Sequence, residues 1–191
     1  MENLLISKND FDCIGQVARH CDWNQLCIYI REQQNLSLLP IIGHCLFSEI
    51  YNNEHADEDD KDEIVSNIWN GGSYTSCAGD IRYHFGLKRS LIHWSYGAYI
   101  YKHPFIDTPF GVVQKINNDS IPVEPKELRN LHLDHRNNAN SYFSMSKDYI
   151  CSVKDFLACD MCDCNCVCDH CSGLGKNTQN RGINFDNVNK F

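Results

Sequence analysis

The chain has 191 residues, of which 42% are hydrophobic and 11% aromatic, so it can bury a core and is not a disordered protein. A formal charge of −8 argues against a protein that binds the phosphates of nucleic acid, which would need a basic face. The N-terminus lacks a signal-peptide pattern and no run of about 18 apolar residues occurs, so we expect a soluble protein made in a reducing compartment.

The first third of the chain predicts short helices with recognisable starts. Ser7 to Asp10 has the spacing of a capping box, and Asp22 can cap a second helix whose apolar residues follow the i, i+3, i+4, i+7 pattern. Pro40 suits the first turn of a third helix. The acidic run at 54–63 predicts a solvated loop and the start of a fourth helix, because carboxylates favour the positive end of the helix dipole.

The stretch from Gly79 to Tyr101 predicts a central helix that ends before Pro104. Two apolar stripes run along it at spacings of three and four residues, so burial is expected around much of its circumference. The stripes consist of Leu87, Leu91, Trp94, Ala98 and Tyr101, and of Ile81, Phe85, Ile92, Tyr96 and Tyr99. Such a helix needs other elements on both sides, so we expect it at the centre of the core.

Between Pro104 and Pro125 the sequence predicts the only non-helical stretch, with a short strand at 111–116. A connection of about 20 residues is longer than most in compact domains, and such loops are usually functional or disordered. We expect a projecting element that packs on a neighbouring subunit through its apolar residues. These candidate interface residues are Phe105, Ile106, Phe110, Val112 and Val113.

A long helix is predicted from Pro125 to Phe156, with a kink at the Asn-rich segment 137–141. The last twenty residues are rich in Asn and Gly and should be mobile unless a partner orders them. The predicted organisation is therefore a mainly α domain over 1–158, a Cys-rich segment over 159–171 and a tail over 172–191.

The Cys-rich segment contains two CxxC pairs, each of which can place two thiolates on one ion. The candidate ligands of a structural zinc ion are Cys159, Cys162, Cys168 and Cys171. The pairs are closer together than in most zinc modules, and Cys164, Cys166 and His170 leave the choice of ligands open. The alternative is a cysteine-rich tail that stays reduced, or forms disulfides after release from the cell. No other cofactor is expected.

Evidence for an enzyme is sparse in the sequence. His132 to His135, followed by Asn residues, loosely resembles the Asp-His and Asn of ββα-metal nucleases. Those residues must come from a strand and a metal-facing helix, whereas this segment lies inside one helical repeat. The chain has no Walker loop, GxGxxG, GxSxG or HExxH motif, so we predict no catalytic residue.

Several motifs occur in an order that resembles a known family. They are Leu39 to Gly43, Leu46 to Ile50, the helix from Leu87 to Tyr101 with its Trp-Ser-Tyr-Gly-Ala-Tyr core, Thr108 to Val113, Lys126 to Leu128, and Ala139 to Phe143. Together they resemble the head-tail adaptor, or connector ring, proteins of tailed bacteriophages, especially the ring protein of crAss-like phages. The resemblance covers roughly residues 4–157.

The resemblance implies a helical structural subunit of the virion, without enzymatic activity, that is assembled in the host cytoplasm as a ring, commonly a dodecamer. The ring would lie below the portal, join the capsid to the tail and extend the DNA channel. Its partners would be further copies of itself, the portal protein and tail or other ring proteins, with DNA passing through without specific binding and with no membrane. The Cys-rich segment departs from this pattern. It supports an alternative, a zinc-binding regulatory protein, and an HNH-like nuclease is a third hypothesis.

Overall fold

The computed structural model of the chain describes residues 4–14, 21–76, 78–103, 105–108, 111–114, 123–153 and 157. This part is mainly helical, as predicted, and adds two antiparallel two-stranded sheets. The helical elements before the first sheet are η1 (Lys8–Ile14), α1 (Trp23–Gln33), the π-helical η2 (Gln34–Leu38), α2 (Leu39–Glu54), η3 (Glu58–Asp60) and α3 (Glu63–Asn70). The remaining elements are β1 (Gly72–Thr75), β2 (Ile81–His84), α4 (Gly86–Lys102), β3 (Phe105–Thr108), β4 (Gly111–Gln114) and α5 (Pro125–Val153).

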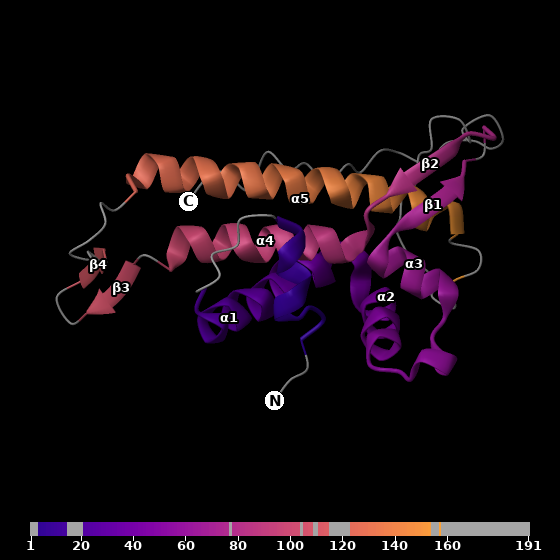
Figure 1. Ribbon diagram of the computed structural model, residues 1–191, viewed down its shortest axis with the longest axis horizontal. Coiled ribbons are helices and arrows are strands. Elements are labelled where there is room, and N and C mark those ends of the chain that lie inside the picture. The colour runs from indigo at the N-terminus through magenta and orange to yellow at the C-terminus, as the bar shows by residue number, and fades with distance from the viewer. Residues whose placement is uncertain are drawn as a thin grey trace.

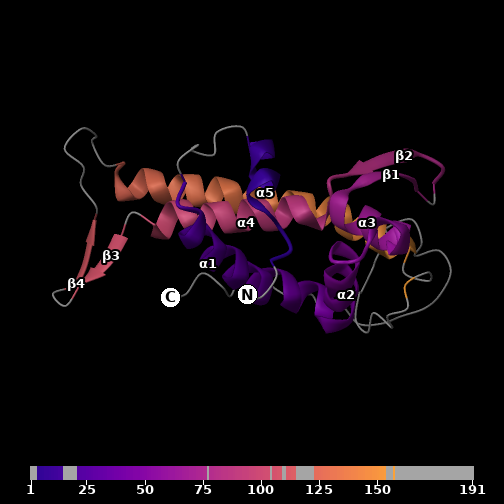
Figure 2. The ribbon, with the colours of Figure 1, turned by 60° about the horizontal axis from the view of Figure 1, so that its bottom comes forward.

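The two longest helices, α4 and α5, lie side by side and antiparallel, and the rest of the chain packs around α4 (Figures 1 and 2). Helix α1 crosses α4 on the side opposite α5, while α3 contacts the N-terminal part of α4. Ten consecutive residues, 90–99, are buried, so burial extends around the whole circumference of the helix. The predicted central helix is therefore confirmed over the part that begins at Gly86.

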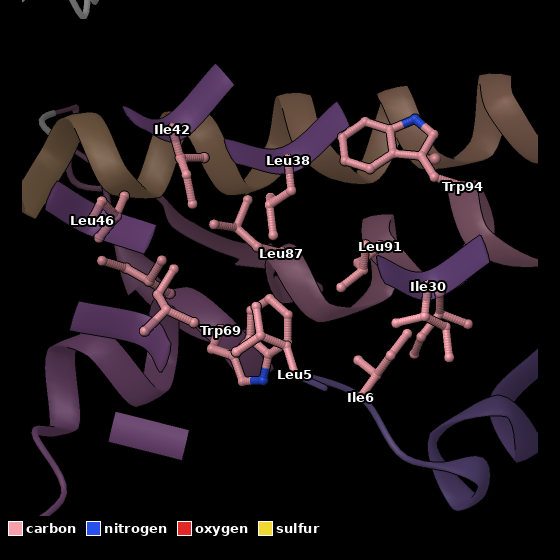
Figure 3. Packing of buried hydrophobic residues seen from close by; sticks show 14 of the residues in the cluster. Leu5, Ile6, Ile30, Leu38, Ile42, Leu46, Trp69, Leu87, Leu91 and Trp94 are labelled. Atoms are coloured by element: carbon pink, nitrogen blue, oxygen red, sulfur yellow. The ribbon is translucent and has the colours of Figure 1, made fainter. Parts of the chain in front are cut away.

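The hydrophobic core joins α4 to the N-terminal helices (Figure 3). Leu87 and Leu91 of α4 are fully buried, as are Ile30 of α1, Leu38 of η2 and Trp69 of α3. Complete burial of one such side chain contributes about 1.5–3 kcal/mol. The core is thus built from elements distant in sequence, and α4 is the element that they share. In the described residues, no helix combines the length and apolar character needed to cross a membrane.

The predicted helix starts are largely confirmed by their capping bonds. The Asp22 carboxylate accepts hydrogen bonds from the Asn24 and Gln25 backbone N–H groups, and Pro40 lies in the first turn of α2. Asp10 accepts from the Ser7 backbone N–H at 2.7 Å, although the element that follows is a 3-10 helix. The acidic run forms the exposed η3, and Asp62 caps α3. Local side-chain chemistry therefore sets these boundaries.

The central helix does not extend back to Gly79, and this part of the prediction is wrong. Residues 72–75 and 81–84 pair as the β1–β2 hairpin, so 104–125 is not the only non-helical stretch. The segment from Ile81 to Phe85 alternates apolar and polar residues, which is the period of a strand. Gly86, with φ of +73°, then turns the chain into α4. Ile81 is consequently 70% exposed rather than part of a buried stripe.

Helix α5 runs from Pro125 to Val153 without a break, so the predicted kink at 137–141 is absent. Tertiary contacts compensate for the poor helix propensity of this segment. Ala139 is fully buried, and Asn140 accepts a hydrogen bond from Trp94 Nε1 at 3.2 Å. The predicted end at Phe156, the Cys-rich segment and the tail lie outside the described residues.

Candidate interaction surfaces

The predicted strand at 111–116 is part of a hairpin that lies beyond the C-terminal end of α4 (Figure 1). Strands β3 and β4 pair antiparallel, with Ile106 opposite Val113 and Asp107 opposite Val112. The hairpin thus brings together four of the five predicted interface residues, which are Phe105, Ile106, Val112 and Val113. The fifth, Phe110, lies outside the described residues.

The sequence interpretation missed a second exposed surface, on the β1–β2 hairpin. Ile81 and Tyr83 are 70% and 71% exposed, the highest values among the large hydrophobic side chains of the described residues. Thr75 pairs with Ile81 and Ser73 with Tyr83, so these four residues share one face of the sheet. All four are exposed. The alternating pattern of residues 81–85 is the sequence signal that could have revealed this face.

The other face of β1–β2 is held on α5 by aromatic packing. The His84 ring stacks on Tyr149 with centroids 4.3 Å apart, and Tyr74 packs against both rings. His84 is 4% exposed, and burial lowers its pKa, so the neutral ring is favoured there. The hairpin is therefore a fixed extension of the helical body, with one face packed and one face open.

The polar residues that resembled a nuclease motif do not converge on a metal-facing site. His132, Asp134 and His135 all lie on one helix, α5, rather than on a strand and a helix. His135 instead forms a hydrogen bond with His93 of α4, with the two Nδ1 atoms 3.1 Å apart. Burial, helped by the neighbouring His135 and Arg89, lowers the pKa of His93 to about 4. The hydrogen bond between these two imidazole rings therefore links α4 to α5, and the neutral form of His93 is favoured.

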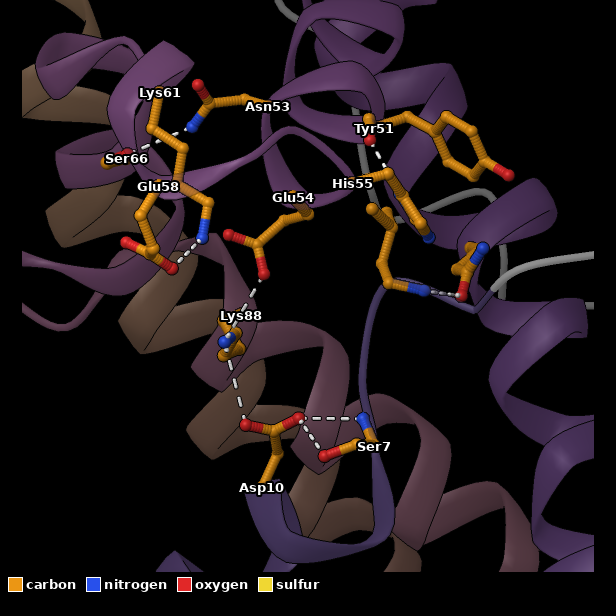
Figure 4. Close-up of polar contacts among 12 residues, drawn as sticks. Ser7, Asp10, Tyr51, Asn53, Glu54, His55, Glu58, Lys61, Ser66 and Lys88 are labelled. Carbon is orange, nitrogen blue, oxygen red and sulfur yellow. Dashed lines mark hydrogen bonds and ion pairs between the residues drawn. The ribbon is translucent and has the colours of Figure 1, made fainter.

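Ion pairs connect η1 and α2 to the start of α4 (Figure 4). Lys88 Nζ lies 3.5 Å from Asp10 Oδ1 and 3.6 Å from Glu54 Oε2, beside a hollow of about 600 Å³. Two carboxylates therefore compensate the charge of this ammonium group. The contacts position η1 and α2 on α4.

A second hollow, of about 350 Å³, lies between the end of α2 and the start of α3. Glu49, Asp60 and Asp62 are among the residues that line it. Burial raises the pKa of Glu49, and the negative charge of Asp62 raises it further. Within the described ranges, no group of three or more His, Cys, Asp or Glu side chains is placed to hold a metal ion. The predicted zinc ligands lie outside those ranges.

Comparison with known proteins relates this architecture to a family. The model of a family of unknown function, DUF6712, matches residues 38–168, which is more than half of the chain. The chain belongs to this family. The match begins at Leu38, at the end of η2, and includes both hairpins, α4 and α5. It also includes Cys159, Cys162 and Cys168, but stops before Cys171. No curated protein and no solved structure matches the chain.

Proposed function

We propose that this chain is a structural subunit of a head-to-tail connector ring in a tailed bacteriophage. In the ring, the β3–β4 hairpin packs on a neighbouring subunit, and the subunits together extend the DNA channel between portal and tail. The role is mechanical rather than enzymatic. The resemblance of motifs in α2, α4 and α5 to adaptor proteins suggested this function, and the position of the hairpin is the observation that carries it.

The β3–β4 hairpin extends away from the helical body and has only two short strands (Figure 1). An isolated two-stranded hairpin is at best marginally stable in water, and a third strand or a hydrophobic surface is needed to stabilise it. Its strands carry Phe105, Ile106, Val112 and Val113, an apolar content that is costly to leave in water. A neighbouring subunit supplies the missing surface.

The charge of the chain supports a channel through which DNA passes without being held. The formal charge is −8, and the run from Asp57 to Asp60 is exposed. Tight binding of duplex DNA requires neutralisation of phosphates by Lys and Arg, and such binding weakens steeply with salt. We therefore expect weak binding of duplex DNA to the assembled ring. Tight, strongly salt-sensitive binding would contradict the proposal.

Assembly of the full chain tests the proposed function. The native mass of the chain should be measured alone and with the portal protein of the same phage. The wild type should form a ring or bind the portal, and the double variant Phe110→Ser with Val112→Ser should remain a folded monomer. The matched control is Leu36→Ser, which removes an apolar side chain that is 68% exposed on η2. The control should assemble as the wild type does.

Three outcomes would contradict the proposal. Unfolding of the double variant would mean that the hairpin belongs to the core of its own subunit. A wild-type chain that stays monomeric with the portal and retains zinc would instead favour the regulatory protein. Absence of the chain from purified virions, as measured by mass spectrometry, would also reject the proposed location.

A further inference from the structure

The cysteines on the helical body are in two chemical states. Cys45 of α2 and Cys151 of α5 are disulfide-bonded, whereas Cys21 and Cys27 are free thiols. Cys45 is also exposed. An exposed disulfide is open to exchange with thiols in solution, so its state follows the redox environment. The identity of the cysteine that pairs with Cys45 therefore decides which part of the chain is held on α2 under oxidising conditions.

The chain returns to α2 after the end of α5. Helix α5 ends at Val153, and Leu157 lines the hollow between α2 and α3 together with Glu49. Leu157 also packs against the hydrophobic core, so its position is fixed by burial. On α2, Glu49 lies one turn after Cys45, which is about 6 Å along the helix axis. The Cys-rich segment therefore begins beside the part of α2 that carries Cys45.

The first CxxC pair follows Leu157 closely enough to reach Cys45. Cys159 and Cys162 come two and five residues later, which an extended chain spans with at most about 7 and 17 Å. A disulfide requires Cα atoms about 4.4–6.8 Å apart, so the bond itself bridges a further part of the distance. Chain length therefore allows either cysteine of this pair to bond to Cys45.

The cysteines outside the Cys-rich segment are less well placed. Cys13 lies on η1, which Lys88 connects to Glu54 at the other end of α2. Glu54 is nine residues from Cys45, or about 13 Å along the helix. Cys77 belongs to the connection between β1 and β2, and this hairpin packs on α5. Position along α2 thus favours the segment that follows Leu157.

We propose that a cysteine of the first CxxC pair, Cys159 or Cys162, forms the disulfide with Cys45 and so anchors the Cys-rich segment on α2. The oxidant is a small disulfide such as oxidised glutathione. The Cys45 thiolate attacks one sulfur of the small disulfide and releases the other half as a thiol, and the thiolate of the segment then attacks the Cys45 sulfur and releases the second half. Two protein thiols are oxidised, one small disulfide is reduced, and the two protons pass to the released thiols.

The bond makes the state of the Cys-rich segment depend on redox conditions. A four-thiolate zinc site needs both Cys159 and Cys162 as thiolates, so the disulfide and the zinc site exclude each other. A reducing compartment favours the zinc form expected from the sequence, and an oxidising environment favours the anchored form. The inference does not depend on the connector function, because it concerns a bond within one subunit.

Peptide mapping of the full chain identifies the partner of Cys45. The chain is oxidised with glutathione disulfide, its free thiols are blocked with iodoacetamide, and it is digested without reduction by trypsin and by a protease that cleaves before Asp. The digest places Cys45 alone in peptide 32–56, Cys159 alone in 155–159 and Cys162 alone in 160–162. Mass spectrometry should find peptide 32–56 linked to 155–159 or to 160–162, and reduction should separate them.

Thermal unfolding of the oxidised chain measures the effect of the anchor. With a chelator present to remove zinc, reduction of the wild type should lower Tm by on the order of 10 °C, because the bond closes a loop of more than 100 residues. Cys45→Ser has no such bond to lose, so its Tm should fall much less on reduction. The matched control is Cys27→Ser, at a free thiol of α1, and it should behave as the wild type does.

Three results would overturn the proposal. Alkylation of Cys45 in the oxidised chain without prior reduction would show that it forms no disulfide. A link from peptide 32–56 to Cys13, Cys77, Cys151 or the peptides after residue 162 would assign a different partner. Equal losses of Tm in the wild type and Cys45→Ser on reduction would show that the bond does not hold the segment on α2. None of these measurements requires assembly of a ring, so they are independent of the test of the connector function.

Discussion

The Nδ1 atoms of His93 on α4 and His135 on α5 lie 3.1 Å apart and share a hydrogen bond across the interface of the two longest helices. One ring must donate a proton and the other must accept it, so the bond is lost when both rings are protonated. The groups around the pair include Arg89, His132 and Asp134. Burial lowers the pKa of both histidines, and in His93 the nearby His135 and Arg89 lower it further, to about 4.

This pair predicts a loss of stability in mild acid. The pKa of His93 falls from 6.5 in the unfolded chain to about 4 in the folded one. Between these values the unfolded chain binds the proton and the folded chain does not, so the free energy of unfolding is highest above pH 6.5 and declines as the pH falls toward 4. The contribution of His93 is at most on the order of 3 kcal/mol. The measurement is urea unfolding of the wild type and His93→Gln across this range. An equally steep decline in the variant would show that other groups cause it.

Helices α4 and α5 approach each other closely at Gly97. A Cβ atom at this position would lie 2.9 Å from the Cβ of His135. Ala is favoured over Gly in a helix by about 1 kcal/mol, but overpacking typically costs about 1–3 kcal/mol, so Gly97→Ala should destabilise the protein. Ser144→Ala, on the exposed face of α5, is the control and should be nearly neutral. A Gly97→Ala variant more stable than the wild type in urea would show that the helices separate easily.

Gly86 and Gly79 both have positive φ, but only Gly86 lacks space for a Cβ atom, so the two sites separate the cost of backbone strain from the cost of steric overlap. At Gly86, with φ of +73°, a Cβ atom would overlap the Trp69 carbonyl oxygen and lie 2.5 Å from Gly71 N. At Gly79, with φ of +87°, nothing lies within 4 Å. Gly79→Ala should therefore cost only the left-handed penalty, about 1–2 kcal/mol, whereas Gly86→Ala should cost several kcal/mol. Thermal unfolding of both variants gives the comparison. Equal losses of stability in the two variants would mean that the backbone around Gly86 shifts enough to accommodate the added Cβ atom.

We expect the Cys-rich segment to bind a zinc ion. Cys159, Cys162, Cys168 and Cys171 have the spacing to bind one ion, and the segment has too few apolar residues to fold around its own core. Metal analysis of the full chain should find about one zinc per subunit, and Cys159→Ser with Cys162→Ser should lose it. Less than about one-half zinc per subunit, or thiols that react freely without releasing metal, would contradict this prediction.

The amino-acid sequence by itself determined features that depend on local chemistry and on periodicity. Asp22 and Pro40 could be assigned to helix starts because capping bonds and a fixed φ act within one turn. The three-four repeat likewise located the helical segment from Leu87 to Tyr101, which lies within α4, and the start of α5 at Pro125, because helix faces are set by residues close in sequence. The apolar stretch after Pro104 could be recognised as a separate, non-helical element because it is bounded by Pro104 and Pro125, which favour breaks between helices.

Tertiary structure decided the features in which local signals conflict or distant residues meet. Ile81 and Phe85 fit a helical stripe and also an alternating strand, and the packing of His84 on Tyr149 selects the strand. The Asn-rich segment of α5 stays straight because Ala139 and Asn140 are held by α4. The open face of β1–β2 and the His93 to His135 bond depend on residues that are brought together only when α5 packs on α4, so no local pattern specifies them.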